Sequence, residues 1–218
     1  MASNLSGPLR LAVLISGSGS NLQALIDAIE SGELQNAEIA LVVSSRTDAY
    51  GLQRALQHKL PAIYLPWRQK QRTEGEAKLA ALLHLFQVDL VVLAGWMHIL
   101  SAAFLEQFPQ RVINLHPALL PDAGTGKTYI TSDGTPIPVF RGLHAVQQAL
   151  NAGVKVTGST VHYVTAEVDA GPVICREEVG IEPGDTEECL HERVKMVEHR
   201  LIVEAVRRFL VRDQPPPQ

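Results

Sequence analysis

The 218-residue sequence has little cysteine, no large excess of either charge and no long hydrophobic run, and each scarcity excludes a class of protein. Cys175 and Cys189 form no CxxC pair, which excludes a disulfide framework or a cysteine zinc site; we expect both to be buried or incidental thiols. Residues 1–8 lack the features of a secretory signal, and nowhere do about 18 apolar residues follow one another. We therefore expect a cytoplasmic protein without a membrane partner.

Charge and composition narrow the class further. The net charge of -4 gives no electrostatic footprint for a nucleic-acid backbone, so we expect no nucleic-acid partner. The 46% hydrophobic and 19% charged residues are typical of a soluble globular protein. The length fits one large domain or at most two small ones. With no internal repeat and no convincing linker, we predict a single domain over 1–218 with a disordered tail at 213–218.

Short apolar runs alternate with helical patterns along the chain. Runs typical of strands lie at 11–15, 39–43, 62–65, 89–95, 111–115, 156–164 and 172–181. Helices are predicted after residue 20 and at 51–58, 74–86, 100–108, 143–151 and 185–211, the last with a capping-box-like start. This order predicts an α/β fold with a doubly wound, mostly parallel sheet. The last two strands are expected to be antiparallel and to bracket Asp169.

The glycine-rich turn at residues 16–21 follows the first predicted strand. Backbone amides at the start of the next helix form an anion site, and we favour a site for one phosphate. The dinucleotide fingerprint GxGxxG fails, because Leu22 stands where it needs glycine. The alternative is a tight turn with Ser20 as the helix N-cap.

A second glycine-rich stretch, residues 124–128, imitates the end of a Walker A loop. That motif needs glycine at the position of Pro121 and a strand just before it, and neither condition holds. Residues 121–141 are instead predicted to form a long exposed loop or a small hairpin, flexible around 124–128. Lys127 is expected to contact an anion only occasionally.

The most informative residues are Asn114 and His116, at the end of a predicted strand. Side chains two residues apart on a strand point the same way, so the pair can address one reacting atom. They resemble an oxyanion pair, for which Asp169 is the candidate carboxylate. His162, which shares a strand face with Thr160, either supports this site or is a satisfied core residue. The Glu198–His199 pair on the last helix is expected on a solvated face.

Four separate motifs carry a family resemblance. They are Ile15–Gln23, Val92–Met97, Ile113–Pro121 and Asp169–Ile174. Together, in this order, they resemble the folate-dependent phosphoribosylglycinamide formyltransferases, over about residues 10 to 210. The resemblance implies a Rossmann-like formyltransferase fold, with a phosphate-binding half at about 10–110 and a folate-binding and catalytic half at about 111–212.

The resemblance also implies the reaction and the residues that perform it. The formyl group of 10-formyltetrahydrofolate, a co-substrate, passes to the amine of 5-phosphoribosylglycinamide in purine biosynthesis, with no tightly bound cofactor and no metal. The partners are then small molecules, for a monomer or a homodimer. Asn114, a protonated His116 and Asp169 match the catalytic residues, with Thr160 and His162 in support. Gly19, Ser20, Asn21, Lys195 and Glu198 match the site for the ribonucleotide. Arg72, Met97, His98, Ile99, Leu100, Thr165, Ala166, Glu167 and Val168, with Asn114 and Asp169, match the folate pocket.

The chain departs from the family pattern at two places. His98 stands where we expect arginine, and the segment at about 122–141 is longer than the expected loop. Two alternatives share the catalytic core, a methionyl-tRNA formyltransferase and a formyltetrahydrofolate hydrolase, but each is expected to carry a further domain. A nicotinamide oxidoreductase is disfavoured by the failed fingerprint. A non-catalytic folate or nucleotide sensor remains only if the three catalytic residues are misplaced.

Overall fold

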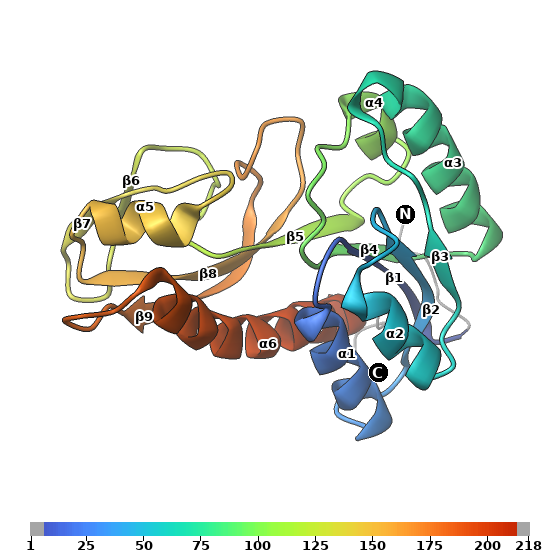
Figure 1. Cartoon of the computed structure of the whole chain (residues 1–218), viewed down its shortest axis with the longest axis horizontal. Coiled ribbons are helices and arrows are strands. Elements are labelled where there is room, and N and C mark those ends of the chain that lie inside the picture. Colours follow the sequence, from blue (N-terminus) through green and yellow to red (C-terminus); the bar gives the residue numbers. More distant parts are fainter. Residues whose placement is uncertain (1–6, 213–218) are drawn as a thin grey trace, which may run out of the picture.

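A computed structural model describes residues 7–212, which form a three-layer α/β structure around one seven-stranded sheet (Figure 1). The predicted disorder at 213–218 lies outside the described residues. The strand order is β3-β2-β1-β4-β5-β8-β9. The strands are β1 Leu9–Ile15, β2 Ala37–Ser44, β3 Ala62–Tyr64, β4 Leu90–Leu93, β5 Val112–His116, β8 Val156–Tyr163 and β9 Val173–Gly180. Pairing is parallel from β3 to β5 and antiparallel from β5 to β9, as predicted.

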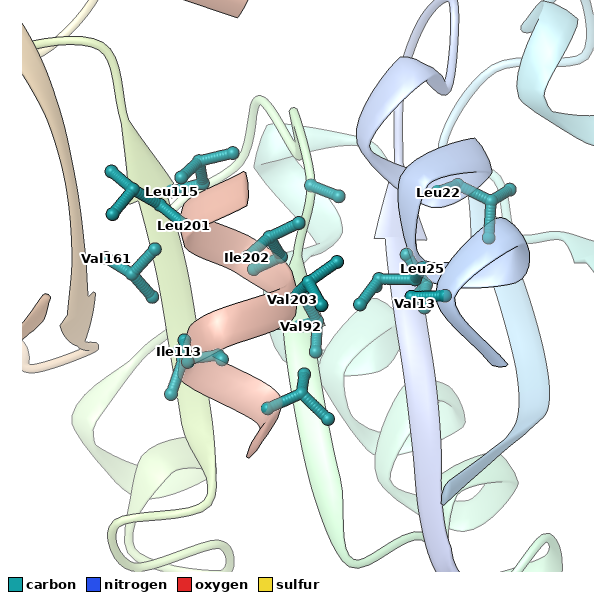
Figure 2. Packing of buried hydrophobic residues seen from close by; sticks show 14 of the residues in the cluster. Val13, Leu22, Leu25, Val92, Ile113, Leu115, Val161, Leu201, Ile202 and Val203 are labelled. Carbon is teal, nitrogen blue, oxygen red and sulfur yellow. The ribbon is translucent and has the colours of Figure 1, made fainter. Parts of the chain in front are cut away.

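The helices cover both faces of this sheet. They are α1 Ser20–Glu30, α2 Tyr50–Gln57, α3 Arg72–Leu85, α4 Ala102–Leu105, α5 Ala145–Asn151 and α6 Glu187–Arg212, with a short 3₁₀ helix at Gln69–Gln71 before α3. Leu22 of α1 and Ile202 of α6 pack with Val13 on one face, where all three are fully buried (Figure 2). Leu83 of α3 packs with Leu14 on the other face. Strands buried on both faces consist of continuous apolar runs, which is why the sequence predicted them well.

The turn between β1 and α1 depends on glycine. Gly19 has a φ of 70°, and a Cβ there would lie 2.6 Å from the Cα of Gly51. A side chain at this position therefore has no space and no favourable backbone conformation. Ser20 is the first residue of α1 and not its N-cap, because the cap is Gly19, without a side-chain hydrogen bond.

Two predicted helices begin or end differently in the structure. The helix expected over 100–108 is only Ala102–Leu105, because the chain leaves the α pattern in turns whose amides bond three residues back, such as Phe108 N to Leu105 O. The last helix is capped by Thr186, whose Oγ1 accepts from Cys189 N at 3.2 Å. Asp185 instead pairs with Arg193.

The long segment after β5 forms a hairpin of β6 Thr128–Ile130 and β7 Pro136–Pro138, one of the two predicted possibilities. Within the stretch 124–128, which was expected to be exposed and flexible, Gly124 is buried. Of the two thiols, Cys175 is buried and Cys189 is exposed. Among residues 7–212, no helix has the length and apolar character needed to cross a membrane.

Candidate active site

A cavity of about 550 Å³ lies beyond the carboxyl ends of β1, β4 and β5. Open α/β sheets bind ligands at this edge. The β1–α1 turn, the loop before α5, the β8–β9 loop and α6 complete its walls. The lining residues are 17–21, 93–100, 114–117, 142–144, 162, 164, 165, 167–169, 191, 195 and 198. Three segments that the sequence singled out, the glycine turn, the Met97 stretch and the Asn114–His116 strand end, therefore share one cavity.

The alternation of β5 places Asn114 and His116 on one face, and the pairing of β5 with β8 places His162 opposite Asn114. The Nδ2 atom of Asn114 lies 3.2 Å from His162 Nε2 and 3.4 Å from Asp169 Oδ1. His162 is 2% exposed and also bonds the carbonyl of Tyr163 through Nδ1 at 2.9 Å. Its position supports the Asn114 amide, so it belongs to the site.

Asp169 reaches the site from the loop between β8 and β9. Its Oδ2 accepts a 2.8 Å hydrogen bond from the Gly142 amide and lies 3.4 Å from His116 Nδ1. Its Oδ1 lies 3.5 Å from His162 Nε2. Its φ is 49°, an uncommon value for a residue with a side chain. The carboxylate thus contacts both imidazoles and the Asn114 amide.

The charge state of Asp169 follows from these contacts. Burial raises its pKa, but the hydrogen bond from His162, the Coulombic effect of His116 in its protonated form and the Gly142 amide outweigh burial and lower the pKa to about 2. Asp169 is therefore ionised at neutral pH.

His116 is also buried, but for this residue burial outweighs the other effects on its pKa. Its Nε2 lies 2.8 Å from the Phe140 carbonyl, which can only accept, so Nε2 carries a proton. Burial lowers its pKa below 6.5, although Asp169 and Phe140 partly offset this. Burial therefore disfavours the protonated form of His116 in the absence of substrate, against the expectation that Asp169 favours that form. The 3.4 Å distance to Asp169 is longer than an ordinary hydrogen bond, consistent with no shared proton.

The residues assigned to the ribonucleotide line the same cavity. Gly19 and Ser20 line it at the start of α1, and Lys195 lines it from α6. Asn21 Nδ2 donates to Glu198 Oε2 at 3.1 Å, while Asn21 Oδ1 is buried without a partner. Glu198 is 7% exposed, so the expected solvated face is wrong at this residue. The site keeps an unused polar atom beside a carboxylate.

The residues assigned to the folate pocket are only partly brought together. Nine of them line the cavity: Met97, His98, Ile99, Leu100, Asn114, Thr165, Glu167, Val168 and Asp169. Two residues assigned to the folate pocket, Arg72 and Ala166, are outside the lining, as is Thr160, which was assigned a supporting role. Arg72 lies 3.8 Å from Glu76, and Thr160 donates to the Ala118 carbonyl at 2.7 Å.

The unexpected His98 belongs to an aromatic cluster. Its ring stacks on Trp67 with centroids 5.5 Å apart and meets the edge of Trp96 at 5.3 Å. Burial lowers the pKa of His98. A neutral ring therefore stands where the family resemblance predicts a permanent cation.

Among the lining residues that were not assigned from the sequence are Gly142, Leu143, His144 and His191. The first three follow the long hairpin segment, so their distance from Asn114 along the chain hid them. His191 lies one helical turn before Lys195, and that spacing could have indicated a shared face. Among residues 7–212, no group of three or more histidines, cysteines, aspartates and glutamates could hold a metal ion.

Comparisons with known proteins find formyltransferases. A family model described as "Formyl transferase" matches residues 9–206. The chain is 38% identical to the phosphoribosylglycinamide formyltransferase of Haemophilus influenzae, over 88% of this chain and 82% of that protein. It is 39% identical to the human trifunctional purine biosynthetic protein adenosine-3 over 90% of this chain, but spans only 18% of that relative's length.

Solved structures of formyltransferases share this fold. Glycinamide ribonucleotide transformylase 1 from Symbiobacterium toebii superposes with a TM-score of 0.79 at 42% identity, covering 93% of this chain and 87% of that one. The phosphoribosylglycinamide formyltransferase from Bacillus halodurans superposes with a TM-score of 0.80 at 35% identity, covering 94% and 97%.

Proposed function

The chain belongs to the formyl transferase family, and on that premise we propose that it is a phosphoribosylglycinamide formyltransferase of purine biosynthesis. The formyl donor is 10-formyltetrahydrofolate, and the products are formylglycinamide ribonucleotide and tetrahydrofolate. The observation that carries the proposal is the single cavity that joins the glycine turn, the three polar residues Asn114, His116 and Asp169, and the Met97–Leu100 stretch.

The lining of the cavity offers suitable groups for both substrates. The Gly19–Asn21 backbone at the start of α1 favours an anion, and Lys195 adds a positive charge, which supports binding of the phosphate by these residues. Glu198, held by Asn21, accepts hydrogen bonds from the ribose or glycinamide. The exposed apolar side chains of Met97 and Ile99 provide a surface for the pterin. Both substrates then meet at the end of β5.

The chemistry balances with these residues. The substrate amine attacks the formyl carbon, a new N–C bond forms, and the carbonyl oxygen becomes an oxyanion. Asn114 Nδ2 donates to this oxygen, and His116, neutral beforehand, takes up the proton that the amine loses as negative charge develops on the oxygen. The bond from the formyl carbon to the folate nitrogen then breaks. The proton lost by the amine reaches that nitrogen through water held by the ionised Asp169.

Competing acceptors test this proposal. The purified protein is incubated with 10-formyltetrahydrofolate and with phosphoribosylglycinamide, methionyl-tRNA or water alone, and tetrahydrofolate formation is followed. We expect turnover only with the ribonucleotide. Turnover of equal rate with methionyl-tRNA, or with water alone, contradicts the proposal in favour of the respective alternative enzyme, and no turnover in any arm contradicts it outright.

A further inference from the structure

Residues 122–141, the segment longer than the family pattern, pack against the loop that carries Asp169. Val173 N donates to the Asp122 carbonyl at 3.0 Å. Gly124 is buried, and a Cβ there would lie 2.1 Å from the Gly171 carbonyl oxygen. The backbone at the start of the segment therefore touches the backbone just after Asp169, at a distance that only glycine permits.

The last residue of the segment, Arg141, ties these two stretches together with its side chain. Its Nε donates to the carbonyl of Asp169 at 3.0 Å. Its terminal nitrogens donate to the carbonyls of Gly124 at 2.7 Å and Gly126 at 2.9 Å. A guanidinium has five donors in a rigid planar fork, so it can hold three acceptors in one fixed arrangement.

Gly142, the residue after Arg141, binds the side chain of the same aspartate. The Gly142 amide donates to Asp169 Oδ2 at 2.8 Å. Two successive residues thus fix the main chain and the side chain of Asp169. This matters because its φ of 49° is an uncommon conformation, and such residues persist only where the surroundings over-determine them.

The far part of the segment is anchored on β9. Glu178 accepts hydrogen bonds from Tyr129 Oη at 3.1 Å and from Ser132 N and Oγ, each at 2.7 Å. The guanidinium of Arg176 lies 5.0 Å from the Tyr129 ring. In Figure 1 the β6–β7 hairpin accordingly lies at the end of the sheet formed by β8 and β9. These contacts with β9 hold the segment that ends at Arg141 against the sheet.

We propose that Arg141 is a positioning residue that holds Asp169 in its working geometry, and that residues 122–141 support this carboxylate instead of contacting substrate. The inference rests on the proposed formyl transfer. Arg141 is absent from the cavity lining, as are all other residues of the segment, so its effect on the reaction passes through Asp169. Misplacement of a reacting group by about 1 Å costs about 100-fold in rate.

The test compares Arg141→Ala with Arg193→Ala. Arg193 is a matched control, since it also donates to a carbonyl, that of Gly180, and to both oxygens of Asp185, but outside the cavity lining. We expect Arg141→Ala to lower kcat about 100-fold with each KM changed less than about threefold. Arg193→Ala is expected to keep the wild-type kcat.

Chemical rescue separates positioning from general damage. Arg141 is half-exposed, so millimolar guanidinium can enter the space left by Arg141→Ala and is expected to restore kcat at least about tenfold, without effect on Arg193→Ala. Arg141→Lys keeps the charge but not the three-point fork, so its kcat should fall between Arg141→Ala and wild type; it carries the test if the alanine variant does not fold. A kcat within about threefold of wild type in both Arg141 variants, or a loss that guanidinium leaves unchanged, overturns the proposal.

A second readout does not depend on formyl transfer. Exchange of the Gly142 amide proton, corrected for the intrinsic rate of each sequence, reports its bond to Asp169 Oδ2. We expect at least about tenfold faster exchange in Arg141→Lys and no change in Arg193→Ala. If the Gly142 amide of Arg141→Lys exchanges at the wild-type rate, the inference about Arg141 is overturned. Wild-type protein that transfers no formyl group contradicts the proposed function alone.

Discussion

Replacing Asp169 by asparagine tests the carboxylate at the centre of the site with little change of shape. The amide oxygen of the substituted side chain can still accept from Gly142, but the negative charge beside His116 is lost. Without that charge, His116 gains its proton less readily when the oxyanion forms. Losing one such electrostatic contribution costs about 3 kcal/mol of transition-state stabilisation, so we expect kcat to fall by about a hundredfold or more.

The same substitution has a bounded effect on stability. The pKa of Asp169 is lowered from 3.8 to about 2. At about 1.4 kcal/mol for each pKa unit, the ionised carboxylate contributes about 2 kcal/mol to the free energy of unfolding. The variant should therefore remain folded at pH 7 but lose up to about 2 kcal/mol in the free energy of unfolding.

Steady-state kinetics with both substrates, alongside urea unfolding followed by circular dichroism, measure the two effects. The matched control is Asp48→Asn, which removes an exposed carboxylate paired with Arg46 and should leave kcat unchanged. A folded Asp169→Asn variant with turnover near that of the wild type would refute the assigned role. Equal loss of turnover in Asp48→Asn would show that the assay reports general damage.

The turn at 17–21, the low pKa of Asp169 and the core each give a further prediction. Glycinamide riboside without its phosphate should show a kcat/KM about 10 to 100 times lower than the ribonucleotide, since charge-assisted hydrogen bonds contribute about 1.5–3 kcal/mol; equal values show that the turn binds no phosphate. The Asp169 contribution to stability is fully present above pH 3.8 and lost as the pH falls through about 2, so the difference in unfolding free energy between wild type and Asp169→Asn should shrink towards zero in acid, and a constant difference contradicts the low pKa. Ile202→Ala, at a fully buried position between α6 and the sheet, should lower the free energy of unfolding by about 2–5 kcal/mol without a matching loss of kcat at a temperature where it is folded; a loss below about 0.5 kcal/mol contradicts the packing (Figure 2).

The sheet could be predicted from the sequence because its strands are nearly continuous apolar runs. Val91 and Val92 pack on opposite faces, and both are fully buried, so hydrophobicity alone marks the strand. Helix ends were predicted less well. Ser20 was a reasonable N-cap by residue type, but the close approach of Gly51 to Gly19 sets the turn, and that contact joins residues far apart in the sequence.

The site was predictable where short-range geometry creates it. Asn114 and His116 share a strand face, so their joint position follows from alternation. Other features depend on tertiary contacts that no local pattern contains. Asn21 of a distant helix bonds the buried Glu198, and the pKa of His116 is lowered because the folded chain covers it despite the nearby Asp169. Arg141 is recognisable only once the three carbonyls around it are placed.

The most direct test of the account follows the formyl group itself. The protein is incubated with 10-formyltetrahydrofolate carrying ¹³C in the formyl group and with phosphoribosylglycinamide, and the products are analysed by mass spectrometry and carbon NMR. The account predicts that the label appears as an N-formyl group on the glycinamide nitrogen, in amounts equal to the tetrahydrofolate released. Label recovered as free formate, or left on the folate after prolonged incubation, would contradict it.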